Sequence, residues 1–220
     1  MKNIVNENRI EKKFVYNQGD ESFRQFLING MFFEAFEPRL VNSIYFDTTA
    51  FHDVWDNING FGNRKKIRIR WYGLINKSNI FIEEKKKINS VTQKTVKNLG
   101  FFNNYTELSN FINDEKFLKQ EFILKNKLNV KRTVFVQYLR NYYELPNQKL
   151  RLTIDKNLKI FNNYPTKYIN LDKTILELKY KVTESQYVND FIYNNKLDNR
   201  NRKFSKYVNS FIELNDSGFI

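Results

Sequence analysis

The chain has 220 residues, of which 41% are hydrophobic, so it can bury a sizeable core and is not a disordered chain. Lys and Arg number 37 against 24 Asp and Glu, and the net charge of +13 favours polyanionic partners such as nucleic acid, polyphosphate, nucleotides or anionic lipid. The absence of cysteine excludes disulfides and thiolate-bound zinc, and no apolar stretch reaches the roughly 18 residues of a membrane-spanning helix.

The sequence carries no evident targeting or linker signal. Its first nine residues are polar and lack the apolar segment of a signal peptide, so a cytoplasmic location is expected. Only 3 prolines occur, and no Gly/Ser-rich stretch divides the chain. We therefore expect one domain over residues 1–220.

The first half of the chain is predicted to alternate strands with short helices. Strands are expected at residues 9–16, 39–48, 64–72 and 79–87. Helical segments are expected at 20–29, where Asp20 stands in the N-cap position, and at 51–57. The short turn between the last two strands predicts a β-hairpin.

The second half is predicted to contain a long helix, a second hairpin and two C-terminal helices. The helix is expected over residues 106–128, and the hairpin pairs 130–143 with 149–155 around Leu145-Pro146-Asn147. A further strand is expected at 174–182. The last helices are expected at 184–196 and 205–214.

Two of the predicted strands repeat a Glu-x-Lys-x-Lys pattern. The triplets are Glu83, Lys85 and Lys87 in the first and Glu177, Lys179 and Lys181 in the second. Because side chains alternate faces along a strand, each triplet shares one face, where a carboxylate can hold a divalent metal and the cations can hold phosphate. A slip of one residue puts Glu84 and Lys86 there instead, and surface ion pairs are the alternative reading.

Other predicted strands also carry charge on one face and apolar residues on the other. In residues 64–71 the even positions are cationic, whereas Ile67, Ile69 and Trp71 are apolar. One such strand is ordinary when its polar face meets solvent. Several in one basic chain favour a β-barrel with an apolar exterior covered by helices and a charged, anion-binding interior.

Taken in order, these segments resemble the VTC domain, the polyphosphate polymerase domain of the vacuolar transporter chaperone family, and its bacterial relatives. The matching motifs lie at residues 9–15, 41–48, 68–73, 81–85, 138–140, 151–155, 175–179 and 204–207. The segment Arg68-Ile69-Arg70-Trp71-Tyr72-Gly73 is similar to the family's Arg-x-Arg-Trp-Tyr-Gly motif. The family's Lys-x-Arg element is matched only in part, because residues 93–96 keep Lys94 without the arginine.

The resemblance implies an α+β architecture, an antiparallel β-barrel of the triphosphate tunnel fold in the CYTH-like superfamily, with helices packed outside. Members of the family transfer the γ-phosphate of ATP onto a growing polyphosphate chain with a divalent metal. The wider superfamily includes triphosphatases, adenylate cyclases and thiamine-triphosphate hydrolases. A tripolyphosphate or nucleoside triphosphate hydrolase therefore stays an alternative, as does a non-catalytic polyphosphate-binding module.

By the same resemblance, site residues fall into three groups. The catalytic candidates are Arg68, Arg70, Arg140, Lys85 and Lys179. The phosphate-binding candidates are Lys13, Lys87, Lys94, Arg151, Ser205 and Lys206. The metal candidates are Glu177, Glu83 and Glu11, whose hard oxygens suit Mn²⁺ or Mg²⁺. For Tyr45 and Asp47, bracing of the barrel and a role in the site are both open.

The expected ligands are ATP and polyphosphate or another triphosphate. An interior tunnel excludes duplex nucleic acid, and no membrane span is expected in this chain. Whether a membrane partner protein is needed stays open.

Overall fold

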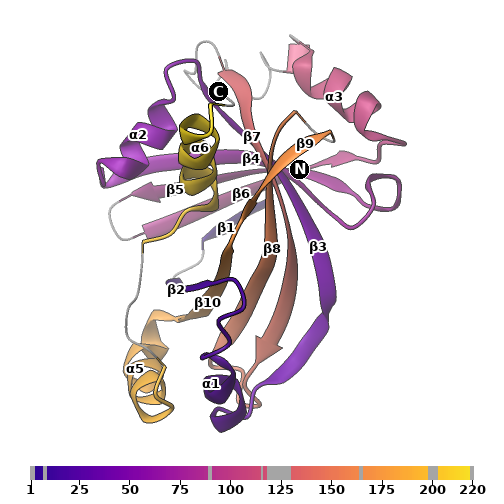
Figure 1. The fold of residues 1–220 in the computed structure, drawn as a ribbon. Helices are drawn as coiled ribbons and strands as arrows, with labels where there is room; N and C mark the ends of the chain where they lie inside the picture. The colour runs from indigo at the N-terminus through magenta and orange to yellow at the C-terminus, as the bar shows by residue number, and fades with distance from the viewer. Residues whose placement is uncertain are drawn as a thin grey trace.

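The computed structural model describes residues 3–6, 9–88, 91–114, 116–117, 130–163, 166–197 and 203–218. Their strands are β1 (Asn3–Asn6), β2 (Arg9–Asn17), β3 (Phe33–Thr48), β4 (Asn63–Tyr72), β5 (Ile80–Ile88), β6 (Val91–Gly100), β7 (Val130–Glu144), β8 (Arg151–Asn163), β9 (Lys167–Leu171) and β10 (Lys173–Lys181). They form one antiparallel sheet in the order β1-β6-β5-β4-β3-β7-β8-β10-β2, with β9 beside β8. The sheet is curled into a half-barrel (Figure 1).

Short helices surround the sheet. They are α1 (Arg24–Asn29), α2 (His52–Ile58), α3 (Tyr105–Asn113), α5 (Ser185–Asn194) and α6 (Lys206–Asp216), with 3-10 turns η1 (Ile75–Lys77) and η3 (Val182–Glu184). In Figure 1, α1 and α5 lie at one end of the long strands, whereas α2, α3 and α6 lie toward the other. The α+β architecture of an antiparallel half-barrel with α1, α3 and α5 packed outside confirms the expected fold class.

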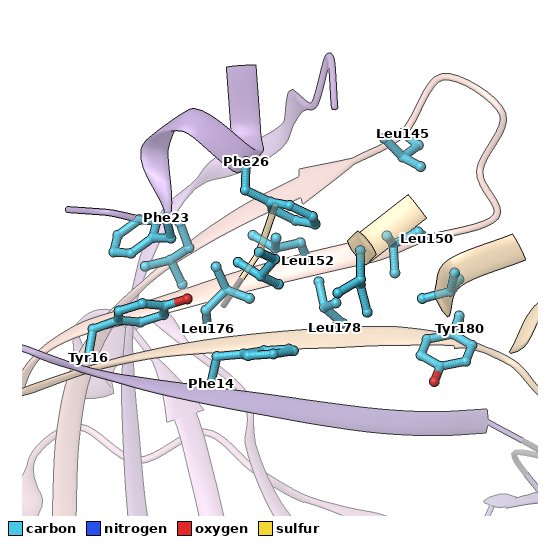
Figure 2. Packing of buried hydrophobic residues seen from close by; sticks show 14 residues of the cluster. Phe14, Tyr16, Phe23, Phe26, Leu145, Leu150, Leu152, Leu176, Leu178 and Tyr180 are labelled. Atoms are coloured by element: carbon cyan, nitrogen blue, oxygen red, sulfur yellow. The ribbon is translucent and has the colours of Figure 1, made fainter. Parts of the chain in front are cut away.

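The outer face of one half of the sheet is covered by α1 and α5. Apolar residues alternate with charged ones along β2 and β10, so Phe14 and Leu176 point outward where Lys13 and Glu177 point inward. Phe26 of α1 and Val188 and Ile192 of α5 belong to the same buried cluster, part of which is drawn in Figure 2. This packing fixes which side chains of β2 and β10 face the concave side.

The outer face of the other half is covered by α3. The apolar positions of β4, Ile67, Ile69 and Trp71, are buried in one cluster with Leu108 and Ile112 of α3. The cationic positions of β4 alternate with them and therefore face the concave side.

Helix α6 packs on the concave face itself. Tyr207, Phe211 and Leu214 share a buried cluster with Tyr45 of β3 and Tyr138 of β7. The bore that the sequence predicts is thus partly filled by a helix that approaches the charged residues with its N-terminal end.

Several predicted boundaries differ from the structure. The helix expected at 20–29 begins only at Arg24, because Asp20 accepts a hydrogen bond from the Ser22 amide in a preceding turn. Strand β3 begins at Phe33 rather than at residue 39, since a register shift between Phe36 and Arg39 takes up Pro38 and lets the strand continue past the proline.

Three strands, β1, β6 and β9, were not predicted from the sequence. The polar composition of β6 gives it no apolar face to recognise, and β9 lies at the sheet margin against β8 alone. In the region predicted as a helix over 106–128, α3 ends at Asn113, and residues 118–128 lie outside the described residues.

Candidate functional site

The strand register decides which charged residues share the concave face. Arg68 of β4 is paired with Glu83 of β5, and Glu177 of β10 with Lys13 of β2. Glu83, rather than Glu84, therefore faces the arginines. The Glu-x-Lys segments of β5 and β10 contribute to the same concave surface.

Glu83 is held by three cations from two strands, β4 and β6. Arg68 donates to its Oε2 through Nε at 2.8 Å, with Nη2 at 2.6 Å, and Lys94 of β6 donates to Oε1 at 3.0 Å. Arg70 Nη1 lies 3.7 Å from Oε2. Burial alone would raise the pKa of Glu83, but Arg68, Arg70 and Lys94 hold it well below its usual range. This carboxylate stays ionised and keeps the cations together.

A second group is centred on Arg140 of β7. Its Nε and Nη2 donate to the two carboxylate oxygens of Asp155 on β8 at 2.5 and 2.7 Å, and Nη2 lies 3.8 Å from Glu177. Lys206 of α6 also pairs with Asp155. Against burial, Arg140 and Lys206 lower the pKa of Asp155 to about 2. Asp155 therefore fixes Arg140 and Lys206.

Glu177 and Glu11 form the acidic part of the wall built by β10 and β2. Lys179 Nζ lies 3.5 Å from Glu177, and Lys85 Nζ donates to both oxygens of Glu11 at 2.8 Å. Burial opposes ionisation of Glu177, yet Lys179, Lys13 and Arg140 hold its pKa well below the usual range. Burial and the charge of Glu177 act to raise the pKa of Glu11, but Lys85 and Lys179 outweigh them. In the register of β2 and β10, where Glu177 pairs with Lys13 and Lys179 with Glu11, the two carboxylates are diagonal neighbours.

The N-terminal end of α6 joins the basic surface. Ser205 is the N-cap and accepts a hydrogen bond from the Val208 amide at 3.3 Å. The same hydroxyl accepts a hydrogen bond from Lys66 Nζ at 2.9 Å, and Lys13 Nζ donates to the Phe204 carbonyl at 3.1 Å. The sequence therefore identified Ser205 and Lys206 as part of this neighbourhood but missed Lys66.

Lys66 is a lysine of the concave surface whose pKa is strongly lowered. Burial and the neighbouring charges of Lys13, Lys85 and Arg64 lower its pKa to about 7. The even-position cation pattern of β4 was the available signal for this residue, because Lys66 lies two residues before Arg68.

Some expected residues lie apart from this surface or take another role. Arg151 is at the rim, with 59% of its side chain exposed, and donates to Glu144 at 3.0 Å. Lys87 lies near the end of β5, where burial and Arg64 lower its pKa. Asp47 accepts hydrogen bonds from the Asp53 and Val54 amides and from the Tyr207 hydroxyl, so it joins α2 and α6 to β3.

The three expected metal ligands are not gathered in one place. No group of three or more His, Cys, Asp or Glu side chains suited to a metal ion occurs in the part of the chain that the structure describes. The Glu83 oxygens already accept from Arg68 and Lys94, whereas Glu11 and Glu177 lie near each other. A helix that could span a membrane is likewise absent from the described ranges.

The curled antiparallel sheet with cations on its concave face is the arrangement expected of a triphosphate tunnel fold. A putative adenylate cyclase from Bacillus halodurans has a similar fold, with a TM-score of 0.58, 12% identity and coverage of 93% of this chain and 98% of that chain. A protein from Pyrococcus horikoshii gives a TM-score of 0.52 at 13% identity, covering 94% and 98% of the two chains. At these identities the likeness shows the fold alone.

The chain belongs to the VTC domain family, whose sequence profile matches residues 8–215. It is also similar to the vacuolar transporter chaperone complex subunit 2 of Saccharomyces cerevisiae, with 29% identity over an alignment 191 positions long that covers 69% of this chain. The chain spans only 22% of the length of that relative.

Proposed function

We propose that the concave face binds a linear triphosphate or polyphosphate and transfers the γ-phosphate of ATP onto a growing polyphosphate chain with the help of a divalent metal. The observation that carries this proposal is the convergence of cations from separate elements on one face. These cations are Lys13, Lys66, Arg68, Arg70, Lys85, Lys94, Arg140, Lys179 and Lys206.

The arrangement suits phosphoryl transfer, which depends on positioning and charge neutralisation more than on covalent catalysis. Arg68 and Arg70 offer planar forks for phosphate oxygens, and Glu83 holds both forks in place. Donors fixed before the substrate binds need little reorganisation during the reaction.

Glu11 and Glu177 fit a divalent metal better than Glu83 does. Mg²⁺ and Mn²⁺ are commonly bound by one or two carboxylates together with phosphate oxygens, and these two carboxylates lie close together. Among the described residues, Arg68, Arg70 and Lys94 together hold Glu83, whereas the oxygens of Glu11 accept from one lysine, Lys85. When bound, the metal would neutralise charge on the phosphate oxygens and orient the transferred group.

Hydrolysis of tripolyphosphate or a nucleoside triphosphate is the second candidate. In the register of β5 and β6, Val96 stands opposite Glu83, at the position where the family resemblance leads one to expect an arginine. The site thus has one cation fewer on this wall than a polymerase of the family would have. A protein partner is part of the proposal, supported by the yeast relative, which is a subunit of a complex.

The proposal is tested by incubating the purified protein with ATP and Mn²⁺ and analysing the products. We expect long-chain polyphosphate and ADP, and loss of both in Arg70→Ala and Glu177→Ala. Lys86→Ala is the matched control, because Lys86 is exposed on the opposite face of β5 and pairs with Glu84 at 3.6 Å. Free phosphate alone would favour hydrolysis, and unchanged ATP with tripolyphosphate binding would favour a binding module.

A further inference from the structure

Three aromatic rings surround one arginine where β3 runs past the end of β4. The guanidinium carbon of Arg39 lies 5.6 Å from the ring centre of Phe36, 6.0 Å from that of Tyr72 and 5.7 Å from that of Tyr142. The Phe36 and Tyr142 rings meet edge to face at 5.8 Å. We name Phe36, Arg39, Tyr72 and Tyr142 the aromatic clasp.

The strand register places the aromatic clasp beside the phosphate-binding surface. Arg39 is paired with Arg140, and Tyr142 with Thr153, which is in turn paired with Glu177. Tyr72 is the last residue of β4 and follows Arg70 by two positions on the same face. The clasp thus continues the concave face at its end, where β3 and β7 extend beyond β4 (Figure 1).

The chemistry of the clasp differs from that of the surface next to it. The concave face offers ammonium and guanidinium groups for phosphate, whereas the clasp offers aromatic rings and one planar guanidinium. Phe36 is 59% exposed, although such a ring would ordinarily be buried. Nucleobases bind by stacking on aromatic rings and on guanidinium planes, and every base has a face that can stack.

We propose that the aromatic clasp is the nucleobase site of this protein and makes it prefer a nucleoside triphosphate to inorganic triphosphate. The inference rests on the proposed function, because it takes the triphosphate to lie among Arg68, Arg70 and Arg140. A nucleotide held there directs its base along β3 and β7 toward Arg39. Because stacking reads only the face of the base, the site is expected to accept purines and pyrimidines alike.

Binding of two probes by calorimetry tests the inference: a non-hydrolysable ATP analogue and inorganic tripolyphosphate. Phe36→Ala removes an uncharged, exposed ring. The affinity for the ATP analogue is expected to fall about 10-fold, as it does when a base-stacking ring is lost. The affinity for tripolyphosphate is expected to change less than about 2-fold. Phe36→Trp should restore the affinity for the ATP analogue. The matched control is Phe101→Ala, another exposed phenylalanine, which lies between β6 and α3.

Failure of the inference and failure of the proposed function give different results. In one outcome, the wild-type protein binds tripolyphosphate, and Phe36→Ala leaves the affinities for both probes unchanged or lowers them equally. This outcome would overturn the nucleobase site alone. Wild-type protein that binds neither probe would overturn both. If Phe101→Ala lowered the affinity for the ATP analogue as much as Phe36→Ala does, the inference would also be contradicted.

Discussion

Lys85 of β5 donates hydrogen bonds to both carboxylate oxygens of Glu11 on β2, each at 2.8 Å, although the two strands are not neighbours in the sheet. β2 ends the order of hydrogen-bonded strands, and β5 stands near the opposite end. The contact therefore crosses the concave face. It shows that the sheet curls far enough for its two walls to meet through side chains.

Replacement of Lys85 is expected to weaken anion binding and to release Glu11. Lys85→Ala should lower the affinity for tripolyphosphate about 10-fold, because a charge-assisted contact to phosphate is lost. Lys86→Ala removes the same charge from the opposite face of β5 and should change the affinity less than about 2-fold. Calorimetric titration of both variants provides the measurement. Equal effects of the two substitutions would mean that overall charge, rather than the concave surface, governs binding.

Glu83→Gln is expected to destabilise the ligand-free protein more than the ligand-bound one. The substitution leaves Arg68, Arg70 and Lys94 close together without their shared carboxylate, and loss of one partner from a buried ion pair costs about 3–5 kcal/mol. Thermal melts should show a lowered Tm that tripolyphosphate largely restores. For comparison, Glu84→Gln changes the neighbouring carboxyl on the other face, and tripolyphosphate should not selectively rescue it.

Tripolyphosphate binding is expected to take up protons near neutral pH through Lys66. Its pKa of about 7 leaves part of the population neutral at pH 7 to 8, and a bound polyanion favours the charged form. Affinity should therefore fall as the pH rises above about 7. Calorimetry in buffers of different ionisation enthalpy measures the uptake, which Lys66→Met should reduce. An unchanged uptake in that variant would assign the protons to the ligand itself.

The lowered pKa of Lys66 also affects the stability of the ligand-free protein. This stability is expected to rise with pH, whereas the affinity for tripolyphosphate is expected to fall. Between the folded pKa of about 7 and the ordinary value of 10.5, the unfolded chain binds more protons at Lys66 than the folded protein does. The contribution of Lys66 to the free energy of unfolding must then rise with pH across this window. Urea denaturation of wild type and Lys66→Met, compared at pH 7 and pH 9.5, measures it. The wild type should gain stability relative to the variant at the higher pH.

Asp155→Asn is expected to destabilise the protein by about 3–5 kcal/mol, because Arg140 and Lys206 lose their buried partner. With a folded pKa of about 2 against an ordinary 3.8, Asp155 contributes stability that is present above about pH 4 and lost as the pH falls through 2. Denaturant titrations at pH 7 and pH 3 measure both effects. A difference between wild type and variant that fails to shrink at pH 3 would contradict this account.

The alternation of charged and apolar residues predicted much of the fold and one face of the site. Ile67 and Ile69 of β4 are buried beneath α3, and Arg68 and Arg70 face the concave side, because strand geometry enforces a period of two. The same rule does not reach β6, whose residues lack an apolar face. Nor does it show that α6 packs within the curve of the sheet, since that depends on tertiary packing.

Contacts that cross the concave face could not be predicted from the sequence. The ion pair of Glu11 and Lys85 depends on how strongly the sheet curls, and the aromatic clasp depends on β3 extending past Pro38. Asp47 is a comparable case, because its role in joining α2 and α6 follows from where these helices pack. The sequence indicated which residue types take part, whereas the curvature decides which of them meet.

On the proposed function, the contact between Lys85 and Glu11 would let one ligand prepare the site for another. A phosphate that draws Lys85 to itself takes that cation away from Glu11 and leaves a carboxylate free beside Glu177. On the proposed function, affinity for the divalent ion would increase once the phosphate chain is seated. Nucleotide and metal would then bind cooperatively, and the empty protein would hold the ion weakly.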